Sequence, residues 1–117
     1  MNAKLVVETN DSSPGAGVAP GTARVHAEID GHRFVVADCL FYGTQDDYTG
    51  GTDYAYRVEL HRANEKWIVR VVRFEEIHYG ASSERTEISA LEEDGTLRRL
   101  PDDTALSDAT LVDKISG

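Results

Sequence analysis

Residues 54–74 read Tyr54-Ala-Tyr-Arg-Val-Glu-Leu-His-Arg-Ala-Asn-Glu-Lys-Trp-Ile-Val-Arg-Val-Val-Arg-Phe74. Two runs rich in β-branched and aromatic residues flank the polar segment 63–66, and this pattern predicts an antiparallel hairpin. Because strand side chains alternate between the two faces, the first run places four apolar side chains on one face: Tyr54, Tyr56, Val58 and Leu60.

The second run of this hairpin is apolar on both faces. Trp67, Val69 and Val71 point one way, and among the residues pointing the other way only Arg70 is charged. A strand with two apolar faces is typical of the middle of a layered structure. We therefore expect a central strand with the core on one side and a helix or second layer on the other.

Asp30-Gly31 predicts a two-residue hairpin turn, since glycine and aspartate both tolerate the positive φ that such turns need. This turn sets apolar residues opposite each other on one face and opposite charges on the other. The expected pairs are Ile29 with His32, Ala27 with Phe34, Val25 with Val36, and Glu28 with Arg33.

Asp94-Gly95 marks a second turn, where a three-residue loop with a bulge at Gly95 gives the better match. It pairs Leu91 with Leu97 and Ile88 with Leu100. Pro101 then ends the strand, because proline cannot donate to the ladder.

The two ends of the chain differ from this pattern. Lys4–Thr9 reads as a short strand, and residues 10–22 form a Gly/Pro/Ser-rich segment that we expect to be a flexible loop. In residues 102–117 the apolar positions approach a helical period. The sequence thus predicts a mainly β fold, either a single antiparallel, strongly twisted sheet or a partly open barrel, of about six or seven strands with one short C-terminal helix.

Composition restricts the function classes. A length of 117 residues predicts one domain spanning 1–117. The formal charge of −9 disfavours direct attraction to nucleic-acid phosphates and favours a basic protein partner. No apolar run is long enough to span a bilayer and no signal peptide is visible, so we expect no membrane partner and a cytoplasmic location. The lone cysteine, Cys39, is expected to be buried.

Residues 43–53 are the best candidate for a contact surface. The segment combines glycine and small polar residues with flanking tyrosines, a composition suited to adaptable protein contacts, although an ordinary hairpin loop has the same composition. We read it as too long for a simple turn. The candidate contact residues are Tyr42, Asp46, Asp47, Tyr48, Asp53 and Tyr54.

A pocket is the alternative site. A curved sheet can enclose a cavity lined by aromatic residues, and a carboxylate beside an imidazole is the minimum for acid–base chemistry. The residues of this alternative are Phe34, Tyr56, Trp67, Glu76 and His78, near Tyr54. Residues 56–69, where a turn precedes a tryptophan, resemble the curved-sheet hairpin of nuclear-transport-factor-2-like domains. Those domains begin with helices, whereas this chain begins with a strand, so no site residue is transferred.

No motif for phosphate, dinucleotide or metal binding or for nucleophilic catalysis is present. We therefore predict no cofactor, no metal and no catalytic residue. The leading hypothesis is a small acidic protein-binding domain, such as an inhibitor, an immunity-type partner or an assembly subunit, that contacts its partner through residues 43–53. The alternatives are a small-molecule-binding or enzymatic sheet and a homo-oligomeric structural domain.

Overall fold

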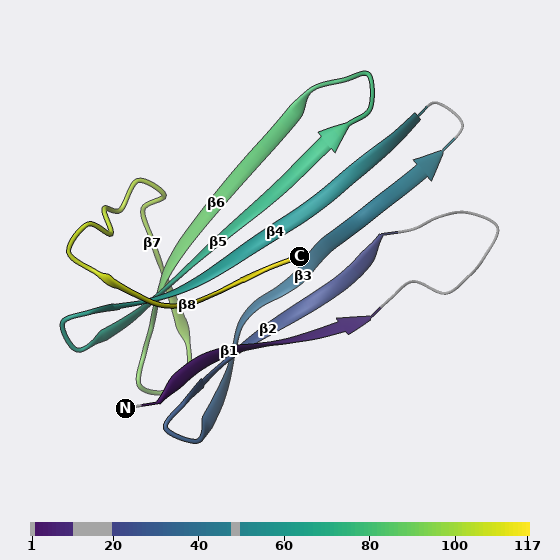
Figure 1. The fold of residues 1–117 in the computed structure, drawn as a ribbon. Helices are drawn as coiled ribbons and strands as arrows, with labels where there is room; N and C mark the ends of the chain where they lie inside the picture. The colour runs from purple at the N-terminus through teal and green to yellow at the C-terminus, as the bar shows by residue number, and fades with distance from the viewer. Residues whose placement is uncertain (1, 11–19, 48–49) are drawn as a thin grey trace.

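The computed structural model describes residues 2–10, 20–47 and 50–117. Every regular element in this part of the chain is a strand, and the strands are antiparallel in the order β1-β2-β3-β4-β5-β6-β7, with β8 beside β4 (Figure 1). The strands are β1 (Ala3–Asn10), β2 (Gly21–Ile29), β3 (His32–Asp47), β4 (Gly50–Ala63), β5 (Lys66–Ile77), β6 (Ser82–Leu91), β7 (Leu97–Leu100) and β8 (Thr110–Ser116). The predicted mainly β, antiparallel sheet is confirmed.

The long strand β3 joins the two parts of the sheet. Its first part pairs with β2 up to Tyr42, and from Gly43 onward it pairs with β4 instead. The backbone turns between these parts at two residues with positive φ, Cys39 (52°) and Gly43 (87°). The strands β1–β3 consequently fold over β4 and β5, and β8 occupies the edge of β4 that β3 leaves free.

The predicted C-terminal helix is wrong, since Thr110–Ser116 is strand β8. Residues 57–62 of β4 offer an unpaired backbone edge, and the tail satisfies it through an antiparallel ladder. Short isolated helices are marginal in water, and Thr110, Val112 and Ile115 are β-branched residues that favour strands. The long-range ladder therefore outweighs the weak helical period.

The hairpin predictions are largely confirmed. At Asp30-Gly31 the observed register pairs Ile29 with His32, Ala27 with Phe34 and Glu28 with Arg33. The expected partner of Val25 is wrong by one residue: Val25 faces Ala37, because the register shifts on both sides of Val25.

At Asp94-Gly95 both expected pairs are present, Leu91 with Leu97 and Ile88 with Leu100. Gly95 has a φ of 89°, the conformation that the bulged turn requires.

The core lies between the folded-over strands. It is built from Val25, Ala27 and Leu40 on one layer and Val58 and Leu60 on the other, all below 1% exposed. Strand β5 is buried on both faces, as predicted: Val69 and Val71 face this core, and Ile68 and Val72 are buried on the opposite face. In place of the expected helix, the chain beyond β7 continues through residues 101–109 into β8.

The predicted Gly/Pro/Ser loop, residues 10–22, falls partly on strands: Asn10 ends β1 and pairs with Thr22 of β2. Its centre, residues 11–19, lies outside the described residues. Among the described residues, no helix is long and apolar enough to cross a membrane.

Candidate functional site

The outer halves of β3 to β6 extend beyond the core as a four-stranded projection (Figure 1). We call it the arm: residues 43–47, 50–55, 73–77 and 82–86, with the turn 78–81. The described chain measures 50 × 29 × 19 Å, and its radius of gyration of 15.8 Å exceeds the value of about 13 Å expected for a compact domain of this length. Gly51 is the only buried residue among those of the arm whose burial the structure describes. Both faces of the arm are therefore accessible.

Most of the segment 43–53, which we expected to be a loop, is a regular hairpin. Gly43 pairs with Tyr54, and the ladder continues to the pair Asp47 and Gly50. The expectation of a long loop is thus wrong, because the polar residues that suggested it are accommodated in a solvent-exposed ladder. Tyr48 lies outside the described residues, as does the side chain of Asp47.

Hydrogen bonds at the end of the arm join two residues that we had assigned to different candidate sites. Asp53 Oδ2 lies 2.9 Å from His78 Nε2, and Thr44 Oγ1 donates to Asp53 Oδ1 over 2.7 Å. The hydrogen bond from Thr44, followed by that from His78, lowers the pKa of Asp53. The hydrogen bond to Asp53 and its negative charge raise the pKa of His78. These two hydrogen bonds link the turn after β5 to the β3–β4 hairpin.

Gly51 lies under this contact. The backbone N–H of His78 donates to the carbonyl of Gly51 over 2.8 Å. A Cβ at Gly51 would stand 2.9 Å from both His78 Nδ1 and Asp46 Oδ1. The imidazole and the Asp46 carboxylate therefore lie so close to the backbone that any larger residue at position 51 would displace them. We call Thr44, Asp46, Gly51, Asp53 and His78 the tip cluster.

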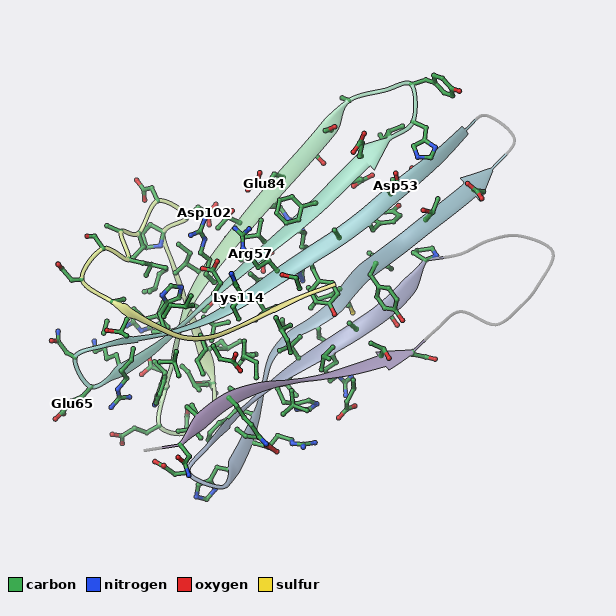
Figure 2. The ribbon with its side chains drawn as sticks, viewed as in Figure 1. Asp53, Arg57, Glu65, Glu84, Asp102 and Lys114 are labelled. Atoms are coloured by element: carbon green, nitrogen blue, oxygen red, sulfur yellow. The ribbon has the colours of Figure 1, made fainter. Side chains whose placement is uncertain are left out.

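The outer face of the arm carries a hollow of about 370 Å³. Phe74 and Ala55 supply apolar surface, and its charged lining consists entirely of carboxylates. Figure 2 labels two of these acids, Asp53 and Glu84, along the arm. The lining residues are Asp53, Tyr54, Ala55, Phe74, Glu75, Glu76, Ser82, Ser83 and Glu84. We call this the acidic hollow.

The groove on the opposite face of the arm is larger, about 680 Å³, and shares Tyr54, Glu75, Ser83 and Glu84 with the acidic hollow. Phe41 and Tyr54 meet there with ring centroids 5.4 Å apart. The remaining lining mixes both charges and includes Cys39, Arg73, Glu75, Ser83, Glu84 and Arg85. The expectation that Cys39 is buried is wrong: its positive φ at the bend of β3 leaves it exposed.

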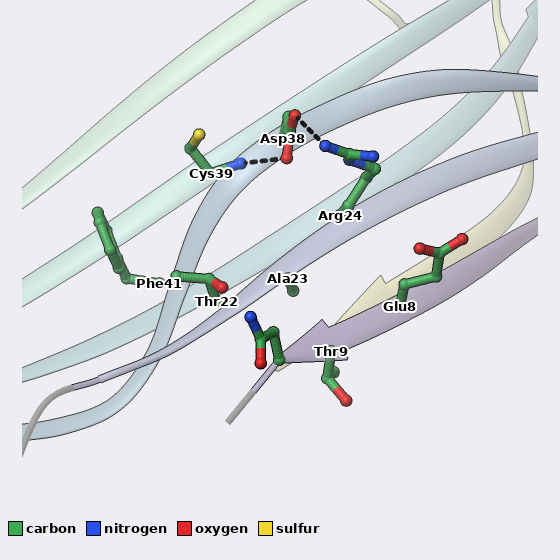
Figure 3. A pocket seen from close by; sticks show the side chains of 9 residues that line it. Glu8, Thr9, Thr22, Ala23, Arg24, Asp38, Cys39 and Phe41 are labelled. Carbon is green, nitrogen blue, oxygen red and sulfur yellow. Dashed lines mark hydrogen bonds and ion pairs between the residues drawn. The ribbon is translucent and has the colours of Figure 1, made fainter. Parts of the chain in front are cut away.

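A third hollow, of about 300 Å³, adjoins this groove and is lined by β1, β2 and β3 (Figure 3). Asp38 accepts hydrogen bonds there from Arg24, over 3.1 Å, and from the backbone N–H of Cys39, over 2.8 Å. The guanidinium of Arg73 also donates to the carbonyl of Asp38. These contacts fix the bend of β3, from which the arm begins.

The residues of the alternative pocket are spread along the molecule. Phe34 and Trp67 line a hollow of about 280 Å³ near the β4–β5 turn, where Arg62 stacks 4.5 Å from the Trp67 ring. Tyr56 is in the core, and Tyr42 meets it edge-on at a centroid distance of 6.4 Å. Glu76 and His78 lie on the arm.

Sequence reasoning missed a buried charged group on β4. Glu59 Oε1 lies 2.9 Å from His61 Nε2, and Glu59 Oε2 lies 3.0 Å from Arg57 Nε. Burial raises the pKa of Glu59, but the hydrogen bond from His61 and the charge of Arg70 outweigh it and the net pKa is lowered. The signal was the spacing of Arg57, Glu59 and His61 at every second residue, which places them on one face.

Among the described residues, no group of three histidine, cysteine, aspartate or glutamate side chains is arranged to hold a metal ion. No protein-family model, curated protein or solved structure matches this chain. The function is therefore inferred from the geometry of the arm.

Proposed function

We propose that the protein binds a basic protein partner through the outer face of the arm. The acidic hollow is the observation that carries this proposal, because it combines an aromatic floor with carboxylates and no basic lining residue. Aromatic surface ringed by charge suits the methylene stem and cationic head of a lysine or arginine. Asp53 of β4 and Glu84 of β6, both labelled in Figure 2, belong to this lining.

The charge of the whole arm supports the same partner class. Its acids whose side chains are described are Asp46, Asp53, Glu75, Glu76 and Glu84, against the two arginines Arg73 and Arg85. An excess of one sign on a projecting surface steers oppositely charged partners and speeds their association. The attraction weakens as salt is added.

A cation already packs against the floor of this face within the chain. The guanidinium carbon of Arg57 lies 5.8 Å from the centroid of the Phe74 ring. Arg57 and Phe74 share this face of the sheet, so the ring already has a guanidinium as a neighbour there. A partner residue approaching from the outer side would find the same ring and, in addition, the carboxylates of Glu76 and Glu84.

An aromatic anchor lies at the end of this surface. Tyr79, in the turn after β5, is fully exposed at 102%. Tyr79 also has a φ of 62°, a conformation that costs a non-glycine residue about 1 kcal/mol. An exposed aromatic residue in an unfavourable backbone conformation supports a contact role, since aromatic anchors dominate the binding energy of interfaces.

Photo-crosslinking tests this proposal directly. A photoreactive amino acid replaces Tyr79 on the arm or, as the matched control, Glu65, which lies at the opposite end of the molecule (Figure 2). In native lysate, the Tyr79 derivative should give one discrete crosslinked product, and the yield of that product should fall as the salt concentration rises. The Glu65 derivative should give no such product. Equal products from both positions, or none from position 79, would reject the arm as the contact site.

A second function is favoured by the groove on the other face of the arm. Its volume of about 680 Å³ lies within the range typical of small-molecule sites, and the Phe41 and Tyr54 rings, which contact each other at a tilt of 48°, offer an aromatic wall. We propose a planar small molecule as its occupant. An NMR screen of planar aromatic fragments that follows the ring signals of Tyr54 tests this second function. No change in the Tyr54 signals with any fragment would contradict it.

A further inference from the structure

We propose that a proton on His78 regulates this protein's binding of basic partners, by competing with the partner for the carboxylate of Asp53. The inference rests on the proposed function, because it assigns a control to the same acidic hollow. Asp53 is shared by the two structures concerned: it lines the hollow and it is the hydrogen-bond partner of His78.

The geometry holds the imidazole on this carboxylate. His78 Nε2 is 2.9 Å from Asp53 Oδ2, while Thr44 occupies the other carboxylate oxygen at 2.7 Å. The ring also lies against the backbone of Gly51. Because the His78 backbone is itself bound to the Gly51 carbonyl at 2.8 Å, the ring stays beside Asp53 in either protonation state.

The charged groups that face His78 are acidic. Asp53 comes from β4, Asp46 from β3 and Glu76 from β5, and each favours the protonated imidazole. The pKa of His78 is raised, with the Asp53 hydrogen bond as the largest cause. The proton is therefore lost only as the pH rises above the ordinary histidine range of about 6.5.

The consequence for binding follows from the charge balance. With the proton bound, the imidazolium and the Asp53 carboxylate form an ion pair of zero net charge at the rim of the hollow. After its loss, the neutral ring leaves the carboxylate charge available to a lysine or arginine of the partner. At a separation of several ångström in a water-exposed site, removing one positive charge changes the affinity for a cationic group by about threefold. Binding should thus strengthen as the pH rises.

The test uses an oligolysine peptide as the probe and the chain of 117 residues. Its affinity is measured by isothermal titration at about pH 5.5 and about pH 8, on either side of the histidine range. The wild-type chain should bind about threefold more tightly at the higher pH. His78→Gln should remove this ratio. His32→Gln, which changes an exposed histidine on the distant hairpin, should preserve it.

A second measurement examines the hydrogen-bonded pair without any probe. An NMR titration should show a raised pKa for His78 that returns toward its ordinary value in Asp53→Asn. Peptide binding with the same pH ratio in His78→Gln as in the wild type would overturn the regulation alone. Absence of peptide binding at both pH values, in a folded chain, would overturn the proposed function and the regulation together.

Discussion

The backbone N–H of Leu5 donates a hydrogen bond of 2.8 Å to Oδ2 of Asp113, across 108 residues of chain. Leu5 belongs to β1 and Asp113 to β8, so one side chain bridges the two strands at the open seam of the sheet. The β4–β8 register shifts beside Asp113, and its other oxygen accepts the N–H of Lys114. The carboxylate thus substitutes for a ladder bond that β1 and β8 do not form.

Removing this carboxylate should destabilise the fold. Asp113→Ala leaves the part-buried N–H of Leu5 without its acceptor, and an unsatisfied amide costs about 1–3 kcal/mol. Asp113→Asn should cost less, since its amide oxygen still accepts. Urea denaturation gives the free energy of unfolding. Asp103→Ala, which removes an exposed acid, is the control; equal losses in both alanine variants would argue that net charge alone is responsible.

The charged group around Glu59 predicts a specific acid sensitivity. The pKa of Glu59 is lowered in the folded state, so its contribution is present above the unfolded value of about 4.3 and is lost as the pH falls through the folded pKa. Glu59→Gln should destabilise the fold by about 1–3 kcal/mol at neutral pH. The loss should be smaller at about pH 3 than at neutral pH, because lowering the pH moves wild-type Glu59 toward its protonated form.

Urea denaturation at the two pH values measures this effect. Glu93→Gln, at an exposed position, serves as the control and should leave the free energy of unfolding within about 0.5 kcal/mol of the wild type. A Glu59→Gln loss that is the same at both pH values would show that the cost arises from packing and not from charge.

Gly51 should be required for the tip cluster. In Gly51→Ala, the new methyl group would stand 2.9 Å from His78 Nδ1 and from Asp46 Oδ1, which forces the imidazole away from Asp53. The pKa of His78 should then fall toward its ordinary value in an NMR titration. Ser83→Ala, also on the arm, should leave that pKa unchanged. Retention of the raised pKa in Gly51→Ala would mean that the backbone yields instead.

Tyr79 allows binding and stability to be separated. Tyr79→Gly relieves a φ of 62° at an exposed site, so the free energy of unfolding should stay unchanged or rise by up to about 1 kcal/mol. Affinity for the crosslinked partner should nevertheless fall, because the aromatic anchor is lost. Thermal melts and binding assays on the same sample measure both quantities. Undiminished affinity would remove Tyr79 from the contact surface.

The sequence predicted the parts of the fold that local rules determine. Asp30-Gly31 and Asp94-Gly95 carry their own turn geometry, and the pairs that follow from it, such as Leu91 with Leu97, are observed. The exchange of partners along β3 has no comparable local signal. It depends on the bend at Cys39, and that bend creates the free edge of β4 which turns the C-terminal segment into β8.

The candidate site shows the same division. Asp53 and His78 were recognisable as polar residues suited to a site, yet they were assigned to different ones. They are 25 residues apart, and their contact depends on the length of the β4–β5 hairpin and on the turn that follows β5. The acidic hollow likewise combines residues of β4, β5 and β6, whose register no single segment reveals.

The most direct test of the central claim is a map of backbone amide shifts as an oligolysine peptide is titrated into the protein. Binding at the arm predicts salt-sensitive shifts concentrated around Phe74, Glu76 and Glu84, with the β4–β5 turn at Glu65 unaffected. Shifts spread evenly over the acidic residues of the whole surface, or centred away from the arm, would contradict it.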